Sequence, residues 1–219
     1  ISAILGGTAN LTMSGAGTLT LSGANTYTGT TSITAGTLSV TGSLSDSTAV
    51  SVSNGATYSV GASDTIASLA GAGSVNLNSF TLTLGNASGN YSGVMSGTGG
   101  FTLSGGSETF SGTSTNTYTG GTTISGGTLT LGASNRLADT GAVTVSGGTL
   151  AIGAYSDTVA GVTLSSGSIT GTTGVLTGSS YSITNGTGTS TTISAILGGT
   201  GNLTMSGAGT LTLSGANTY

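Results

Sequence analysis

The beginning of this chain is repeated at its end. Residues 1–27 return as residues 193–219 with one difference, Ala9 in the first copy against Gly201 in the second, so the two copies are related by a fixed long period. Such a period is typical of repeat proteins, in which each unit buries its apolar face on its neighbours. The sequence therefore predicts one full repeat over residues 1–192 and the start of the next over residues 193–219. We expect the whole to be a segment of a longer array.

Charge is scarce, and this excludes several classes of function. Charged residues make up 3% of the chain, against roughly 25% in an ordinary domain. Arg136 is the single cation, so the basic clusters that bind nucleic acid or anionic lipid are missing. Without His or Cys there is no Ser/His/Asp triad, no thiol nucleophile and no ordinary zinc site. We expect no metal, no cofactor and no nucleic-acid partner.

The chain is nevertheless expected to fold. Its mean hydropathy is +0.33, whereas disordered chains combine low hydrophobicity with high net charge. Apolar and hydroxyl residues alternate in Thr18–Leu21, Thr81–Leu84 and Thr128–Leu131, which is the pattern of half-buried strands. No run reaches the ~18–20 apolar residues of a membrane helix, so no membrane span is predicted in this segment.

Short strands separated by small-residue turns are predicted throughout. They are Ser2–Leu5, Asn10–Met13, Thr18–Leu21, Thr31–Ile33, Thr37–Val40, Ala49–Ser53, Thr57–Val60, Ser74–Leu77, Ser79–Leu84, Gly100–Leu103, Thr122–Ile124, Thr128–Leu131, Ala142–Val145, Thr149–Ile152, Val162–Leu164 and Thr192–Leu197. Each offers only two or three inward apolar positions, too few for the thick core of a sandwich. An all-β parallel solenoid fits better, with about 20–24 residues in each three-strand coil and about eight to ten coils, roughly 40–48 Å, per repeat.

Glycine and asparagine are expected at the corners of these coils. Glycine adopts the left-handed backbone region without steric cost, and asparagine tolerates it. Asn25, Asn54, Asn116, Asn185 and Asn217 lie beside predicted turns and could also form side-chain ladders. Residues 44–66 and 132–160 hold the only base and four of the five acids, so we expect loops or bulged coils there.

One pattern resembles a known family. Residues 17–40 read GTLTLSGANTYTGTTSITAGTLSV, and residues 116–131 and 209–219 repeat parts of this text. It resembles the autotransporter-associated β-strand repeat, also called the passenger-associated transport repeat, of bacterial surface and secreted proteins. The resemblance implies a right-handed parallel β-helix that is exported through an outer membrane. Members commonly serve as adhesins, matrix components or stalks, and the repeat brings no catalytic residues.

Paired acids are the strongest indication of an enzyme. Asp46 and Asp64 are separated by roughly one coil, as are Asp139 and Asp157, so each pair could stack on neighbouring coils and supply the two carboxyls of a polysaccharide-degrading site. We favour solvated corner residues instead, with Arg136 and Asp139 as a surface pair of little energetic value. We therefore predict that the chain is not an enzyme and has no catalytic, cofactor-binding or metal-binding residues.

Two exposed patterns could mediate binding. Tyr27, Tyr118 and Tyr219 share the motif Asn-Thr-Tyr, either as an aromatic row that contacts glycans or, as we favour, as rings that cover a corner of the coil. Outward threonine pairs could order ice. They begin at Thr18, Thr81, Thr128 and Thr210, an irregular spacing that argues against an ice-binding face.

The prediction is an extracellular or cell-surface structural segment that forms a filament, stalk or adhesive fibre. It would associate with itself end to end or laterally. The alternative is an adhesin that binds glycans or surfaces, and a hydrolase or an ice-binding solenoid is less favoured.

Overall fold

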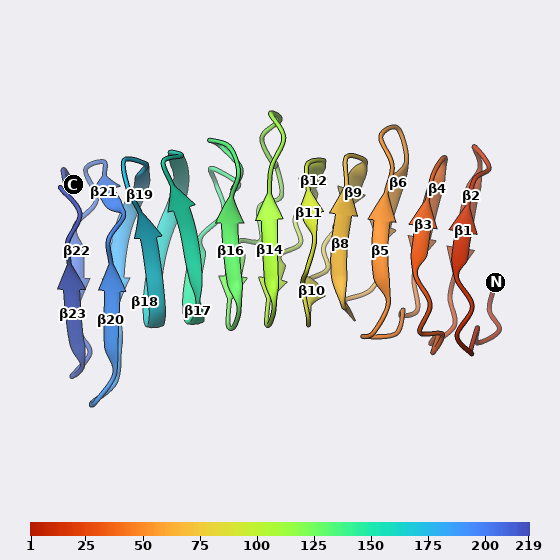
Figure 1. Cartoon of the computed structure of the whole chain (residues 1–219), viewed down its shortest axis with the longest axis horizontal. Coiled ribbons are helices and arrows are strands. Elements are labelled where there is room, and N and C mark those ends of the chain that lie inside the picture. Colours follow the sequence, from red (N-terminus) through yellow and green to blue (C-terminus); the bar gives the residue numbers. More distant parts are fainter.

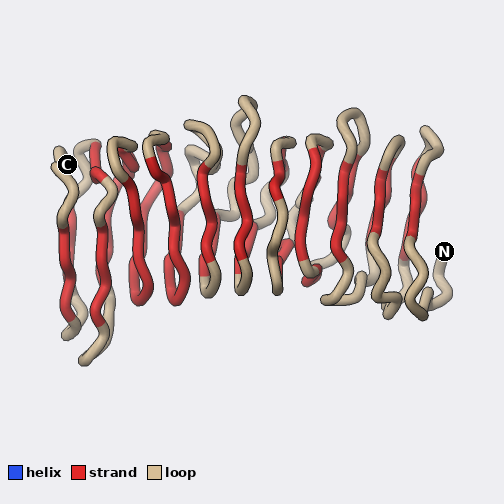
Figure 2. The backbone as a smooth tube through the Cα atoms, viewed as in Figure 1, coloured by secondary structure: helices blue, strands red, loops and turns tan.

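The computed structural model describes all 219 residues as a single column of 23 short strands with no helix. The coils follow one another along the column in sequence order, and the two termini lie at opposite ends (Figure 1). Strands and connecting turns alternate along the whole path (Figure 2). Every registered strand pair is parallel, for example Leu11 with Thr31 and Thr31 with Val50. The all-β parallel solenoid is therefore confirmed, with about 10 turns. None of its elements is a helix long and apolar enough to cross a membrane.

Each coil has three sides, which we number 1 to 3, and along the chain side 3 is followed by side 1 and then side 2. Side 1 stacks β1 (Leu11–Met13), β3 (Thr31–Ile33), β5 (Ala49–Val52), β8 (Ser68–Gly71), β11 (Asn90–Tyr91), β14 (Ser107–Phe110), β16 (Thr128–Leu131), the ends of β17 (Val143–Gly153) and β18 (Asp157–Gly171), β20 (Ser190–Ile193) and β23 (Thr210–Leu213).

Side 2 begins with the five-stranded sheet β2 (Thr18–Leu21), β4 (Thr37–Val40), β6 (Thr57–Val60), β9 (Ser74–Asn76) and β12 (Val94–Ser96), and continues through the starts of β18 and β19 (Val175–Ile183) to β21 (Ile196–Gly198). Side 3 stacks β7 (Asp64–Ile66), β10 (Leu82–Leu84), β13 (Phe101–Leu103), β15 (Thr122–Ile124), the start of β17, the middle of β18, the end of β19 and β22 (Leu203–Met205).

The core is a narrow column inside these three sides. Alternation places one face of every strand inward: in β4, Leu38 and Val40 are buried while Thr37 and Ser39 are only half-buried. Stacking repeats this from coil to coil, so 44 buried apolar residues form one continuous cluster from Met13 to Leu197. Each coil thus contributes a few apolar side chains and relies on its neighbours to bury them.

Coil length is slightly more variable than predicted. Residues paired between neighbouring coils are 17 apart at Thr57 and Ser74 but 24 apart at Ser168 and Thr192, so the predicted lower limit of about 20 was too high. Of the loops or bulged coils expected at 44–66, the loop alternative was wrong, because β5, β6 and β7 lie there. Within 132–160, only residues 132–142 and 154–156 lie outside strands.

Several predicted strand limits were also wrong. Ser2–Leu5 is not a strand, since it lies at the open end without a preceding coil to pair with. The predicted Thr192–Leu197 is broken at residues 194–195, where the chain turns from side 1 to side 2. Conversely, β17, β18 and β19 continue around corners that the sequence pattern separates into short strands.

The corner prediction holds for glycine but not for the chosen asparagines. Left-handed φ values occur at thirteen glycines, such as Gly36 with φ 68°, and at two other residues, Asn78 and Asn135. None of the five expected asparagines adopts this conformation. Asn25, Asn116 and Asn185 are instead buried, and no hydrogen bond joins one of the five to another, so the expected ladder is absent.

The two near-identical copies occupy different sides of the column. Residues Thr18–Leu21 form β2 on side 2, whereas their copy Thr210–Leu213 forms β23 on side 1. Leu11 begins side 1, whereas its copy Leu203 lies on side 3. Each strand of the second copy therefore lies on the side that precedes, in chain order, the side of its counterpart in the first copy. The reason is that one full period of the sequence is one side shorter than a whole number of coils. The motif can form strands on different sides because the three sides present the same kind of inward-facing strand.

Candidate functional site

Asp64 is the acid that most resembles a catalytic group, but in the structure its carboxylate accepts hydrogen bonds from the backbone. It shares a polar depression of about 310 Å³ with Asp46, Ser63, Thr65, Thr81 and Thr83. Its Oδ2 accepts the backbone N–H of Leu44 at 2.8 Å, and its Oδ1 accepts that of Thr65 at 3.0 Å. Burial raises its pKa to about 6 although these bonds oppose the rise. Asp64 thus satisfies backbone of the preceding coil.

Asp157 repeats this arrangement without a neighbouring depression. It is 2% exposed, and its Oδ2 accepts the N–H groups of Arg136 at 2.7 Å and Leu137 at 2.9 Å. Its Oδ1 is buried without a partner, and burial raises its pKa to about 6. Asp139 lies in a separate depression of about 240 Å³ that Asp157 does not line. The second predicted pair is therefore not brought together in one site.

These positions correct the expectation of solvated corner acids. Asp46 and Asp139 are exposed, but Asp64 and Asp157 face the core. The sequence contains the signal: in Asp64-Thr65-Ile66 and Asp157-Thr158-Val159, each acid alternates with an inward apolar residue. Strand periodicity thus predicts burial that the charge of the side chain argues against.

Glu108 is a buried acid that the sequence reasoning missed. It is fully buried in β14, at an inward position two residues before Phe110, and neither carboxylate oxygen has a hydrogen-bond partner. Burial raises its pKa to about 8. The nearby backbone amides of Gly89 and Leu69 lower the pKa, but by less than burial raises it. The pattern Ser107-Glu108-Thr109-Phe110 could have revealed it, since Glu108 occupies an apolar position of the alternation.

Arg136 lies inside the column, so the predicted surface pair with Asp139 was wrong. Its guanidinium is fully buried and reaches back along the axis, where Nη2 donates to the carbonyl oxygen of Gly93 at 2.9 Å. Nε and Nη1 have no partner. Burial lowers its pKa from the ordinary range, against the opposing influence of Tyr91 and Asp157. A buried charge with one hydrogen bond is a cost to stability rather than a catalytic device.

We expect native protein to resist trypsin almost completely. Arg136 is the only Lys or Arg in the chain and is fully buried, so the protease can cleave only after local unfolding. Digestion after denaturation should give two fragments, residues 1–136 and 137–219. Gel electrophoresis of native and urea-treated samples tests this, and cleavage of the native chain at the denatured rate would contradict the burial of Arg136.

The asparagines of the Asn-Thr-Tyr motif replace hydrogen bonds of the strand ladder. Asn25 Oδ1 accepts the N–H of Leu5 at 3.0 Å, and Asn116 Oδ1 accepts that of Met95 at 2.7 Å. Asn217 accepts the N–H of Leu197 at 2.8 Å. The amides of the first two also donate to carbonyl oxygens of the following coil. Buried backbone groups are thereby paired where the motif leaves the regular ladder.

The tyrosines of the motif cover the inside of a corner, as favoured from the sequence. Tyr27 and Tyr118 are buried, and each hydroxyl bonds the Oγ1 of the threonine four residues later, Thr31 at 2.6 Å and Thr122. Tyr219 is 41% exposed in the last coil. An exposed aromatic row along the column is therefore not formed.

The hydroxyl and the ring of Tyr118 should contribute separately to stability. Tyr118→Phe removes the bond to Thr122 and should lower the free energy of unfolding by about 1 kcal/mol. Tyr118→Ala also empties the buried ring position and should cost about 3–5 kcal/mol. Urea denaturation measures both values. Tyr155→Ala is the control, because Tyr155 is 40% exposed and its loss should change little.

The outward threonine pairs do not form one flat face. Thr18 begins a strand of side 2, Thr81 precedes β10 on side 3, and Thr128 and Thr210 begin strands of side 1. Ice recognition requires a pair in nearly every coil of one side, so this distribution argues against that function.

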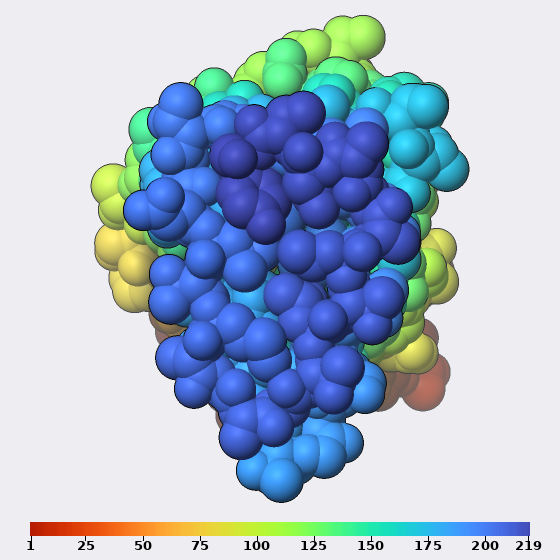
Figure 3. Space-filling view, turned by 90° about the vertical axis from the view of Figure 1, so that its left-hand side faces the viewer, coloured from red at the N-terminus to blue at the C-terminus, as the bar shows by residue number.

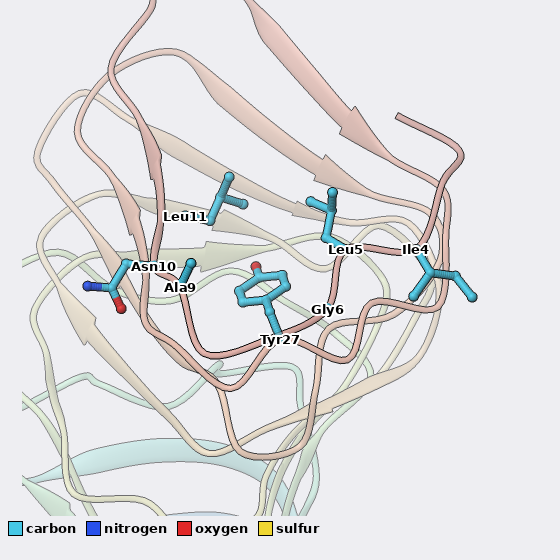
Figure 4. Close-up of a pocket in the computed structure, with 7 residues that line it drawn as sticks. All are labelled: Ile4, Leu5, Gly6, Ala9, Asn10, Leu11 and Tyr27. Atoms are coloured by element: carbon cyan, nitrogen blue, oxygen red, sulfur yellow. The ribbon is translucent and has the colours of Figure 1, made fainter.

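The largest apolar opening lies at the N-terminal end of the column. It has a volume of about 320 Å³ and is lined by Ile4, Leu5, Gly6, Ala9, Asn10, Leu11 and Tyr27. In Figure 4, the side chains of Leu5, Leu11 and Tyr27 surround the opening, while Ile4 and Asn10 point away from it. The opening exists because no coil precedes these residues in the structure.

Comparison with known families identifies one kind of repeat in parts of this chain. Residues 11–40, 113–131 and 198–219 match the passenger-associated-transport-repeat. The chain contains passenger-associated transport repeats. These ranges agree with the residues that carry the resemblance in the sequence. No curated protein and no solved structure matches the chain. Together, repeat and solenoid indicate a segment of an autotransporter passenger, and the family implies a secreted or surface location.

Proposed function

We propose that this chain is a structural segment of an extracellular filament, stalk or adhesive fibre, and that it has no enzymatic activity. The observation that carries the proposal is the continuous core of 44 residues along the column. Because every coil is hydrogen-bonded and packed to the next, bending the column would disturb both kinds of contact, and a rigid rod results. The buried acids support a mechanical role, since Asp64 and Asp157 bond to backbone of a preceding coil.

Rods of this kind would associate with themselves, side by side or end to end. Of the six charged side chains, Asp64, Glu108, Arg136 and Asp157 are buried, which leaves Asp46 and Asp139 on the surface. Two exposed charges provide little repulsion between neighbouring rods, and salt has little left to screen.

Electron microscopy of the native material tests both parts of this proposal. We expect straight rods of uniform width whose axial spacing is about 4.8 Å, the distance between stacked strands. Bundles, where present, should persist when ionic strength is raised to about 1 M, since exposed charge is not what holds them. Flexible or globular particles would contradict the structural role, and bundles that dissolve in moderate salt would contradict lateral association of uncharged surfaces.

A further inference from the structure

Asparagine is followed by glycine at two places in the chain, Asn54–Gly55 and Asn185–Gly186. Such a dipeptide can modify itself, because the backbone nitrogen of the glycine can attack the side-chain amide carbon of the asparagine and close a ring. Glycine hinders this attack least, since it has no Cβ and its backbone is free to turn. Ring closure requires a free side chain and a peptide group that can rotate, so the surroundings of each dipeptide decide whether it reacts.

The first dipeptide is free on both counts. Asn54 and Gly55 form the exposed tip of the turn between β5 and β6, which is closed beside them by a bond of 2.9 Å from the N–H of Ala56 to the carbonyl oxygen of Ser53. No hydrogen bond holds the peptide group between Asn54 and Gly55 or the side chain of Asn54. A Cβ added to Gly55 would meet nothing within 4 Å, so there is room for a ring. The peptide group can therefore turn toward the side chain without breaking a bond of the strand ladder.

The second dipeptide is held in place. The side chain of Asn185 is fully buried, and its Nδ2 donates to the carbonyl oxygens of Thr189 at 3.2 Å and Thr210 at 2.8 Å and to the hydroxyl of Thr191 at 3.3 Å. Its own carbonyl oxygen accepts the N–H of Gly209 at 3.1 Å. Gly209 and Thr210 belong to the last coil, which covers this end of the column (Figure 3). Ring closure at Asn185 would break these bonds, so the folded column protects it.

We propose that Asn54–Gly55 is a site of spontaneous deamidation, and that the fold protects Asn185–Gly186 from the same reaction. The nitrogen of Gly55 bonds to Cγ of Asn54 and loses its proton, while Nδ2 leaves with that proton as ammonia. Water then opens the cyclic imide at either carbonyl carbon. The product is aspartate or isoaspartate, and the isoaspartate is joined to Gly55 through its side chain. Water is the only co-reactant.

This modification goes beyond the proposed structural role, because it changes the surface of the rod with age. Either product adds a carboxylate to a surface on which only Asp46 and Asp139 are charged. The reacting peptide group makes no bond to a neighbouring coil, so the column should remain folded after the reaction. The proposal therefore holds or fails independently of whether the rods act as filaments, stalks or fibres.

Ageing of the folded protein in mildly alkaline buffer tests the proposal, since alkali favours loss of the proton from the attacking nitrogen. Denaturation and cleavage before aspartate by endoproteinase Asp-N separate the two sites, because residues 46–63 contain Asn54 and residues 157–219 contain Asn185. Mass spectrometry detects the change from amide to carboxyl in each fragment, including the shorter pieces produced where Asn54 has become aspartate. Heavy-oxygen water in the ageing buffer, but not in the digest, labels the carboxyls formed during ageing.

In the folded protein, Asn54 should convert at least about 10-fold faster than Asn185, because several hydrogen bonds must break before Asn185 can react. In urea the two rates should agree within about threefold, since the dipeptide is the same and the fold no longer protects either site. Equal rates in the folded protein, or a slower Asn54, would overturn the proposal. A difference in rate that persists in urea would overturn the protection by the fold.

Asn54→Gln is the matched variant for the reacting residue. It keeps the amide and loses no hydrogen bond, but the longer side chain would have to close a larger and less favourable ring. On isoelectric focusing, the natural chain should accumulate a more acidic form during ageing, and the variant should not. An acidic form that accumulates equally fast in the variant would place the reaction elsewhere and overturn the assignment to Asn54.

Discussion

The free energy of unfolding should be highest near pH 4 and should fall steadily as the pH rises to about 8. Glu108, Asp64 and Asp157 all have a raised pKa in the folded chain, with burial as the first cause. Between its unfolded and folded pKa, each carboxyl binds more protons in the folded state, so raising the pH favours unfolding. The stabilisation is complete below the unfolded values near 4 and is lost once the pH passes the folded ones.

The expected effect is large because two of these groups are deeply buried. The pKa of Glu108 rises from 4.5 to about 8, which corresponds to about 4–5 kcal/mol, and that of Asp157 rises from 3.8 to about 6, or about 3 kcal/mol. Asp64 acts in the same direction, but more weakly, since it borders an open depression that solvent screens. Most globular proteins show the opposite trend over the acidic part of this range.

Urea denaturation at pH 4, 6 and 8 measures this dependence, and Glu108→Gln separates its largest contribution. The amide removes the titrating group while keeping the shape, so the variant should match the natural chain near pH 4 and exceed it by several kcal/mol near pH 8. A natural chain whose stability increases between pH 4 and pH 7 would show that these carboxyls are ionised and well paired when folded.

Gly93→Ala should destabilise the column by about 3 kcal/mol or more. A Cβ at this position would lie far inside van der Waals contact with the carbonyl oxygen of Gly73 on the coil below, and 2.7 Å from the hydroxyl of Tyr91. That hydroxyl bonds the same carbonyl oxygen at 2.8 Å, and the carbonyl of Gly93 receives the guanidinium of Arg136. Neither coil can move apart without breaking these bonds, so the strain is not relieved cheaply.

Gly17→Ala is the matched control for this prediction. Gly17 has ordinary backbone and nothing within 4 Å of an added Cβ, so the substitution should change the unfolding free energy by less than about 0.5 kcal/mol. Thermal or urea denaturation of both variants makes the comparison. Equal stability of Gly93→Ala and Gly17→Ala would mean that the coils are not in close backbone contact at Gly73.

Much of the fold can be predicted because short local sequence patterns specify its strands and turns. Two-residue alternation and small-residue turns locate strands such as Thr37–Val40 and Thr128–Leu131 correctly. The number of coils follows from strand spacing and a long internal period. Strand limits at corners are less accurate, since whether β17 turns smoothly or breaks depends on its pairing with β16 and β18.

The polar interior can be predicted only in part. Alternation identifies the inward position of Glu108, but no local pattern indicates that Arg136 extends along the axis to Gly93, 43 residues earlier. Turn propensity places Asn25 and Asn116 at left-handed corners, whereas they replace missing ladder bonds between coils. Partners in neighbouring coils are about 20 residues away along the chain, beyond the reach of turn propensities.

The sequence by itself determined the class of this protein: parallel strands, a repeating coil and a surface almost without charge, because these depend on residue periodicity and composition. Only the tertiary structure decided which side of the column each copy of the repeated segment occupies, with Leu11 on side 1 and its copy Leu203 on side 3. It also decided that Gly201, which replaces Ala9 in the second copy, lies buried against Ser179. The side that each copy occupies and the contact of Gly201 both depend on how many residues form the corners of each coil. Stacking against neighbouring coils determines that number.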